Sequence, residues 1–320
     1  MLNNFSDMSK EILLELYNKV WEEGILPDKW KEAIIIPICK PGKDPNSAAS
    51  YRPIALTSCL GRIMEKLINN RLIYFLESKE KIKSYQFGFR KGRSTIDLAI
   101  CLEHEIRRAQ VNKESVIGVF LDVEKAYDML WKGVLIKIKQ IGLKGKIYRW
   151  IKFFLTGSNI KVKIGGEISS KYQVENGTPQ GSIISPMLFN IMINDIFSNI
   201  DKSFGVSLFA DDGIIWKRGR NTEFINRKLQ EALNKVEEWA LEQGFRFSTS
   251  KSKFVVFTNR KLNIYVNLKL YGNIIEKTDQ FKYLGMWFDK KLTWKIHIDK
   301  MVEKSKRILN MRCLRGKQWG

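Results

Sequence analysis

Two adjacent carboxylates, Asp211 and Asp212, interrupt the apolar stretch "SLFADDGIIW" at residues 207–216. The apolar residues on both sides favour β-strands, and Asp212-Gly213 is a dipeptide typical of hairpin turns. The stretch therefore predicts a β-hairpin with both acids at its tip. Taken alone, the pair is best interpreted as a solvated turn, because turn carboxylates ordinarily face water.

A third acid, Asp122, changes that interpretation. It ends "SVIGVFLDV" (115–123), a near-continuous apolar run typical of a buried strand. Asp122 by itself is also a plausible cap for the helix that follows. If the two strands are neighbours, however, three carboxylates converge at one edge of a sheet, where like charges repel unless a cation lies among them. Clustered carboxylate oxygens favour Mg²⁺, and a pair of such ions can drive phosphoryl transfer.

The charge balance points to a polyanion as partner. Lysine and arginine number 55 against 34 acids, a net charge of +21. Nucleic acid is the first candidate and an anionic membrane surface the second, although a lysine-rich proteome alone would also give this excess. No stretch approaches the ~20 apolar residues of a membrane-spanning helix. Residues 1–24 predict an amphipathic helix rather than a signal peptide.

The cysteines exclude two common kinds of site. Cys39, Cys59, Cys101 and Cys313 show no C-x-x-C spacing, and both histidines lie far from them in sequence. Neither a zinc finger nor a disulfide framework fits, and the pattern suits a reducing, intracellular compartment.

Helices and strands mix along the chain without regular βαβ alternation, which predicts the α+β class. A proline-containing strand at 33–40 is expected at a sheet edge or bulge, followed by a loop over 41–53. A hairpin is expected around Gly165-Gly166. The other expected helices are 59–78, 95–110, 131–142, 146–155, 186–199 and 222–243, with helical spacing in the tail; the other expected strands are 254–257, 268–275 and 281–288.

Three ordered segments carry a family resemblance: "VFLDVEKAYD" (119–128), "NGTPQGSIISPMLFNIMIND" (176–195) and "SLFADDGII" (207–215). They resemble the polymerase motifs of reverse transcriptases from non-LTR retrotransposons, LINE-like and particularly jockey-like. Further similar segments at 26–72, 86–99, 244–257 and 281–289 extend the resemblance over nearly the whole chain.

The resemblance implies a right-hand polymerase with an antiparallel palm sheet backed by helices. We expect an N-terminal helical extension at 1–24, fingers at 25–115, and a palm at 116–288 with finger elements inserted around 131–175. Residues 289–320 would begin a helical thumb that is incomplete, and residues 290–320 carry ten basic and two acidic side chains. The implied reaction is RNA-directed DNA synthesis, in which a primer 3′-hydroxyl attacks the α-phosphate of a dNTP and pyrophosphate leaves.

Residue roles follow from matching positions. Asp122, Asp211 and Asp212 would be catalytic and hold two Mg²⁺ ions, with Mn²⁺ as an alternative. Asp211 is expected to be indispensable, and loss of Asp212 to be partly tolerated. Lys251 would protonate pyrophosphate. The family pattern departs here, with Ser248 for Asn and Ser252 for Thr, so Lys253 stays an alternative to Lys251.

The nucleotide would be bound by a second group of residues. Tyr127 would exclude the ribose 2′-hydroxyl by its bulk, or else pack as a core aromatic. Gln180 and Gly181 would approach the incoming nucleotide, although "TPQGS" is also an ordinary loop before a helix. Candidate triphosphate ligands are Arg52 and Lys40, with Lys43 equally able.

The last expected element is a hairpin at 282–285 that grips the primer end, with Tyr283, Leu284 and Gly285; an ordinary edge strand is the alternative. Expected partners are an RNA template paired with a DNA primer, and dNTPs, with no membrane. The protein is expected to be nuclear when acting at target DNA and cytoplasmic when bound to element RNA.

Two other functions stay open. One is a maturase-like or RNA-templated RNA polymerase, against which stand "FADD" in place of G-D-D and the aromatic Tyr127. The other is a domesticated or truncated copy that binds nucleic acid without catalysis. The three intact acids oppose this second alternative, whereas the expected incomplete thumb favours it.

Overall fold

The computed structural model describes residues 4–124, 133–174, 177–260 and 265–316 of the 320-residue chain. The chain divides into two compact units. The first unit comprises Met1–Ser84 and Lys125–Asp195, and the second comprises Tyr85–Glu124 and Ile196–Gly320. Each unit is therefore assembled from two separate stretches of sequence.

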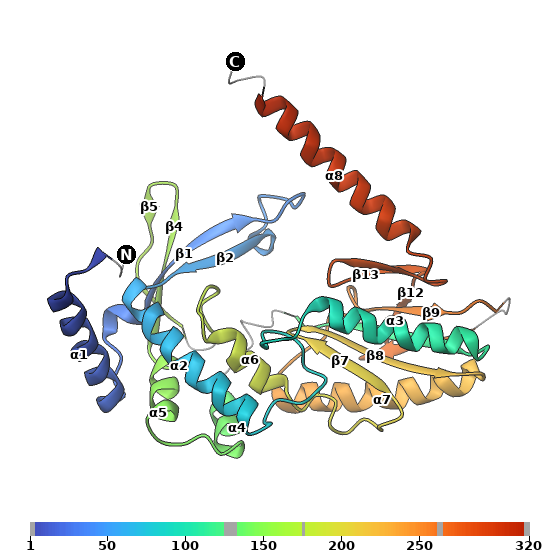
Figure 1. The fold of residues 1–320 in the computed structure, drawn as a ribbon, viewed down its shortest axis with the longest axis horizontal. Coiled ribbons are helices and arrows are strands. Elements are labelled where there is room, and N and C mark those ends of the chain that lie inside the picture. Colours follow the sequence, from blue (N-terminus) through green and yellow to red (C-terminus); the bar gives the residue numbers. More distant parts are fainter. Residues whose placement is uncertain (1–3, 125–132, 175–176, 261–264, 317–320) are drawn as a thin grey trace. The chain divides into compact units, whose positions relative to one another are not determined.

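The first unit combines a mixed sheet with helices (Figure 1). The sheet runs in the order β2-β1-β4-β5, and β6 also pairs with β4. Its helices are α1 (Asp7–Glu23), α2 (Cys59–Ser78), α4 (Val134–Gln140), α5 (Gly145–Phe154) and α6 (Ser185–Ile193), with the short 3-10 helices η2 (Asp28–Trp30) and η3 (Ala48–Ser50). Its strands are β1 (Glu32–Cys39), β2 (Tyr51–Leu56), β4 (Ser158–Ile164), β5 (Glu167–Ile168) and β6 (Tyr172–Val174).

Local signals place most helices of this unit correctly. α2 has the bounds that its periodicity predicts, and it begins where the Ser58 hydroxyl accepts the Gly61 N–H at 3.3 Å. The hairpin expected around Gly165-Gly166 is confirmed as β4–β5. The helix expected to reach residue 199 is shorter, because α6 already ends at Ile193.

Strand β1 corrects the expectation of an edge strand. It lies between two neighbours, antiparallel to β2 and parallel to β4. Pairing with β4 stops at Ile35, so the missing N–H of Pro37 interrupts no bond on that side. On the other side Pro37 lies opposite Pro53 in β2. The loop expected over 41–53 is shorter, because β2 begins at Tyr51.

The second unit is built on a five-stranded sheet in the order β12-β9-β3-β8-β7. All neighbouring pairs are antiparallel except β12 and β9. Its helices are α3 (Thr95–Val111), α7 (Thr222–Gln243) and α8 (Lys295–Gly316). Its strands are β3 (Ser115–Asp122), β7 (Gly205–Phe209), β8 (Asp212–Gly219), β9 (Lys253–Phe257), β10 (Lys269–Leu270), β11 (Asn273–Ile274), β12 (Glu276–Lys277), β13 (Gln280–Tyr283) and β14 (Met286–Asp289).

The central strand β3 is covered on both faces. Val116 and Phe120 belong to one buried cluster with Leu102 and Ile106 of α3. The alternate residues Ile117, Val119 and Leu121 are equally buried, and α7 contacts both β3 and β8. Because each fully buried aliphatic or aromatic side chain contributes about 1.5–3 kcal/mol, this strand anchors the unit and holds its last residue, Asp122, in place.

Two stretches that apolar periodicity predicts as single strands are hairpins. Residues 268–275 form the short pair β10–β11, and 281–288 lie within β13–β14, where Tyr283 is opposite Met286. The hairpin expected at 282–285 from the family resemblance is thus confirmed as an element. Leu284 and Gly285 form the second turn, both at positive φ. Apolar periodicity failed here because it does not register turns of two residues.

The basic tail forms α8, as its helical spacing predicts. Within the described part of the chain, no helix has both the length and the apolar composition needed to cross a bilayer.

Candidate active site

The three predicted acids meet at one end of the central sheet of the second unit. Asp122, the last residue of β3, lies directly opposite Asp212, the first residue of β8. Residues opposed in this way place their side chains on the same face, with Cβ atoms about 4.5–5.5 Å apart. Asp211 precedes Asp212 in the turn of the β7–β8 hairpin. The condition for an acid cluster, that the strand ending in Asp122 neighbours the acid-bearing hairpin, is thus confirmed.

The turn itself differs from the expectation at Asp212-Gly213. Phe209 pairs with Asp212, so the turn consists of Ala210 and Asp211. Ala210 has φ +55°, in the left-handed region that alanine rarely adopts. Asp211 is therefore at the tip, whereas Asp212 is fixed within the strand ladder.

Burial and mutual repulsion disfavour the charged forms of the paired acids. Burial raises the pKa of Asp211, and the nearby Asp122 adds to the rise. Burial likewise raises the pKa of Asp212 to about 6, with further contributions from Asp211 and Asp122. The positive charge of Lys251 lowers both pKa values but does not outweigh these effects. The end of the sheet thus gathers carboxyl groups in a partly desolvated place, where a nearby cation would favour their charged forms.

Lys251 is the cation beside these acids. Its ammonium lies 3.0 Å from Asp122 Oδ2. The segment that carries it is fixed to the end of β3, because the Ser248 N–H donates to the Asp122 carbonyl and the Asp122 N–H donates to Ser252 Oγ. The alternative, Lys253, instead pairs with Glu276 at 2.6 Å. Of the two lysines, therefore, only Lys251 contacts a predicted catalytic acid.

The donor set has the chemistry of a divalent-cation site. Carboxylate oxygens are the ligands that Mg²⁺ and Mn²⁺ prefer, and Asp122, Asp211 and Asp212 supply them at one end of the sheet. Within the described ranges, no group of three or more His, Cys, Asp or Glu side chains already forms a ready-made cluster. The residues fit such an ion chemically, and Asp122 is bonded to Lys251 in the present arrangement.

The predicted nucleotide-binding residues that the structure describes belong to the first unit. Tyr127 lies outside the described residues. Arg52 is exposed in β2, opposite Ile38 of β1. The Lys40 ammonium donates to the Ala49 carbonyl at 2.9 Å.

Gln180 and Gly181 lie in a loop held against β2. The Ala55 N–H donates to the Gln180 carbonyl at 2.9 Å. Gly181 has φ +128°, and a Cβ there would lie 3.0 Å from the Ala55 carbonyl oxygen. This position therefore requires glycine for both conformation and space.

Glu65 of α2, which is not among the residues predicted from the sequence, holds the other side of this loop. Only 5% exposed, its carboxylate accepts the Ser182 hydroxyl at 2.6 Å and the Ile183 N–H at 2.7 Å. Burial raises the pKa of Glu65 despite these bonds. The sequence does carry a signal for it, since Glu65 follows Gly61 and precedes Ile68 at the spacing of the buried stripe of α2.

The hairpin predicted to grip the primer has a buried tyrosine. Tyr283 is 3% exposed, its ring lies 5.1 Å from that of Phe120, and its hydroxyl donates to the Asp212 carbonyl at 3.3 Å. Its side chain therefore supports the acid-bearing strand rather than facing outward. Leu284 packs partly against the same buried cluster, and Gly285 is exposed at the turn.

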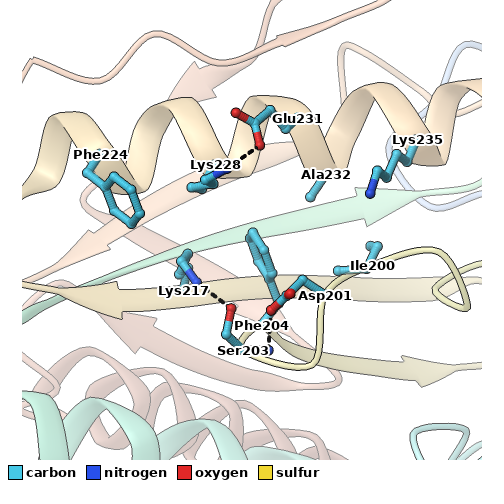
Figure 2. A pocket seen from close by; sticks show the side chains of 10 residues that line it. All are labelled: Ile200, Asp201, Ser203, Phe204, Lys217, Phe224, Lys228, Glu231, Ala232 and Lys235. Carbon is cyan, nitrogen blue, oxygen red and sulfur yellow. Dashed lines mark hydrogen bonds and ion pairs between the residues drawn. The ribbon is translucent and has the colours of Figure 1, made fainter.

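A separate hollow of about 290 Å³ lies between α7, β8 and the segment before β7 (Figure 2). Lys217, Lys228 and Lys235 line it together with Asp201 and Glu231. Lys228 pairs with Glu231 at 2.7 Å, and Lys217 bonds Ser203 and covers the Phe204 ring. Two carboxylates thus offset most of the lysine charge, and the predicted catalytic acids do not line this hollow.

The chain belongs to the reverse transcriptase family. The family described as "Reverse transcriptase (RNA-dependent DNA polymerase)" matches residues 38–288. This range includes the three acids, Lys251, and the Gln180–Gly181 loop.

Two similar relatives come from mobile elements of Drosophila melanogaster. The chain is 32% identical over 299 residues to the RNA-directed DNA polymerase from mobile element jockey, covering 91% of this chain and 32% of that protein. It is 30% identical over 292 residues to the probable RNA-directed DNA polymerase from transposon BS, covering 88% and 32%. The chain thus spans about a third of the length of these curated relatives. The predicted resemblance to jockey-type elements is confirmed.

Solved telomerase structures share the fold. Apo telomerase from Candida tropicalis superposes with a TM-score of 0.56 at 13% identity, covering 91% of this chain and 53% of that one. Telomerase from Candida albicans, solved with a fragment of telomeric RNA, gives 0.54 at 12% identity, covering 87% and 48%. The likeness shows the right-hand polymerase fold of telomerase reverse transcriptase; the division of this chain into fingers, palm and thumb stays a prediction.

Proposed function

We propose that this chain is the polymerase core of an RNA-directed DNA polymerase from a non-LTR retrotransposon. The observation that carries the proposal is the opposition of Asp122 and Asp212 across β3 and β8, with Asp211 in the adjoining turn. The membership of the chain in the reverse transcriptase family supports the same function.

The reaction is nucleotidyl transfer. The primer 3′-oxygen forms a bond to the α-phosphorus of a dNTP, the α–β phosphoanhydride bond breaks, and the hydroxyl proton passes to solvent. Two divalent ions, Mg²⁺ in this proposal, would activate the 3′-hydroxyl and stabilise charge on the phosphates. Asp122, Asp211 and Asp212 would hold them.

The chain's own side chains position the acids that would bind the ions, and one of them offsets negative charge. The β3–β8 ladder fixes Asp122 and Asp212 face to face, so little rearrangement is needed to present oxygen ligands. Lys251 forms an ion pair with Asp122. In this proposal it also donates a proton to the departing pyrophosphate. Roles in triphosphate binding for Arg52, Lys40, Gln180 and Gly181, and in sugar discrimination for Tyr127, are proposed from the family resemblance.

The partners proposed are an RNA template paired with a DNA primer, and dNTPs. The net charge of +21 supports binding to a polyanion, which should weaken steeply with salt. We further propose an intracellular protein, nuclear at its DNA target and cytoplasmic on its RNA.

The deciding experiment is extension of oligo(dT) on poly(rA) with Mg²⁺. Wild type should extend the primer, Asp211→Asn should not, and both should bind the heteroduplex equally. Asp7→Asn, at an exposed position of α1, is the matched control and should extend like wild type. Heteroduplex binding by wild type without extension would instead favour a copy that binds nucleic acid without catalysis.

A further inference from the structure

A short segment of sequence runs along the free edge of the acid-bearing hairpin. Gln86 forms a parallel bridge with Leu208 of β7. The Phe87 N–H donates to the Leu208 carbonyl and the Leu208 N–H to the Tyr85 carbonyl, both at 2.8 Å. Residues 85–87 therefore cover the outer strand of the sheet, whose edge would otherwise expose unpaired backbone groups.

The side chain of Gln86 reaches the turn. Gln86 is completely buried, and its Oε1 accepts the Gly88 N–H at 2.9 Å and the Ala210 N–H at 3.3 Å. Ala210 is the residue at φ +55° immediately before Asp211. A left-handed alanine costs about 1–2 kcal/mol, so the bond from its N–H helps to hold a conformation that alanine alone would leave.

Gly88 makes this approach sterically feasible. A Cβ on Gly88 would lie 2.4 Å from the Ala210 nitrogen and 3.1 Å from the Phe209 carbonyl carbon. Both contacts are with backbone, which cannot rotate away as a side-chain end could. Glycine is thus required here by the proximity of two backbones rather than by a turn of its own.

The Gln86 side chain is uncharged, although it lies near the carboxyl groups of Asp211 and Asp212. The Gln86 amide supplies an acceptor for Ala210 without a negative charge beside Asp211 and Asp212. Its Nε2 is buried and finds no acceptor among the described residues. An unsatisfied buried donor costs about 1–3 kcal/mol. The fold therefore retains the amide at a cost, which indicates that the acceptor it provides is important.

We propose that Gln86 and Gly88 are positioning residues of the active site, a clamp that fixes Ala210 and thereby sets the orientation of Asp211. This inference rests on the proposed function, because it gives Asp211 a catalytic role to be oriented for. It adds two residues of the "QFGF" segment to those that the chemistry needs, although neither contacts the reacting atoms.

The test uses the full chain and two measurements, one of which does not depend on activity. Hydrogen exchange of the Ala210 amide should be slow in wild type and at least tenfold faster in Gln86→Met, which keeps the shape but removes the acceptor. Primer extension by Gln86→Met should lose about 10- to 100-fold in kcat, the effect typical of residues that orient metal ligands, with an unchanged KM for template–primer.

Gly88→Ala is the second variant and should give the same pattern. Gly219→Ala in β8 is the control, since a Cβ there meets only ordinary contacts of 3.5 Å. Fast exchange of Ala210 in wild type would overturn the clamp even if the variants failed to fold. So would a kcat within twofold of wild type once protection of Ala210 is lost. A wild type that protects Ala210 but never extends a primer would refute the proposed function and leave the clamp standing.

Discussion

The two units each contain a loop that carries proposed site residues, and each fixes that loop with one buried side chain. In the first unit, the Glu65 carboxylate holds Ser182 and Ile183, next to the Gln180–Gly181 pair. In the second unit, the Gln86 amide holds Ala210, next to Asp211. The geometry is the same in kind, a buried oxygen accepting backbone N–H groups, but one acceptor belongs to a carboxyl group and the other to an uncharged amide.

The surroundings explain the difference. The groups that shift the pKa of Glu65 are Ser182, the backbone N–H groups of Ile183 and Ile184, and Arg62, all of which favour its charge. No carboxylate is among them. By contrast, Asp122 adds to the burial that raises the pKa of both Asp211 and Asp212, and Asp211 adds to the rise at Asp212. A carboxylate at position 86 would add to that repulsion, so only a neutral acceptor suits the turn.

The largest effect should come from removing Asp211, the acid that the clamp of Gln86 and Gly88 is proposed to orient. Asp211→Asn should lower primer extension on the order of 10³-fold or more, because a metal ligand supplies several kcal/mol of charge stabilisation. Asp212→Asn is the matched comparison and should lose less, since Asp212 is expected to be partly dispensable. Single-turnover extension rates measure both. Equal losses of extension rate in the two variants would show that Asp211, at the turn, is no more important than Asp212, in the strand.

Exchanging the carboxyl and amide groups at positions 65 and 86 tests the comparison directly. Gln86→Glu should lower kcat by at least about tenfold, because an additional buried carboxylate lies beside the acids. Glu65→Gln keeps one acceptor oxygen and should cost about 1–3 kcal/mol of unfolding free energy with a smaller loss of rate. Extension assays and urea unfolding of both variants give the two quantities. If Gln86→Glu extends primers like wild type, neutrality at position 86 has no functional meaning.

Glu65 should also make stability depend on pH. Burial raises its folded-state pKa, so its contribution to the free energy of unfolding is fully present below the unfolded-state pKa of about 4.3. That contribution is lost as pH rises through the folded-state pKa, by up to about 1.4 kcal/mol per pH unit. Glu65→Gln cannot titrate and should therefore gain stability relative to wild type as pH rises from about 4 to 8.

Thermal unfolding across that pH range measures the difference in Tm between variant and wild type. Glu15→Gln, at an exposed position of α1, serves as the control and should track wild type. A difference in Tm for Glu65→Gln that stays constant with pH would mean that Glu65 does not titrate in this range.

The smallest effect is expected at Tyr283, which holds the same hairpin from another side. Tyr283→Phe removes only the hydroxyl that donates to the Asp212 carbonyl. The loss should be about 1 kcal/mol in urea unfolding, with an unchanged KM for primer because the ring is buried. A large rise in that KM would restore a direct role of Tyr283 in gripping the primer.

Much of the fold follows from local pattern. The bounds of α2 and α7 agree with apolar periodicity, and the burial of β3 agrees with its unbroken apolar run. Periodicity failed at the β13–β14 hairpin and at the central place of β1, because strand order and short turns depend on partners that a local window does not contain.

The sequence by itself determined that Asp122 ends a buried strand and that Asp211 and Asp212 lie in a hairpin. Its ordered motifs determined the family. Only the tertiary structure decided that Asp122 faces Asp212, that Lys251 rather than Lys253 contacts it, and that Tyr283 points inward. The tertiary structure also decided the partners of Glu65 and Gln86, since Glu65 and Ser182 are 117 residues apart and Gln86 and Ala210 are 124 apart. Local propensity acts over a few residues, whereas a buried oxygen finds its N–H partners only once packing has brought distant segments together.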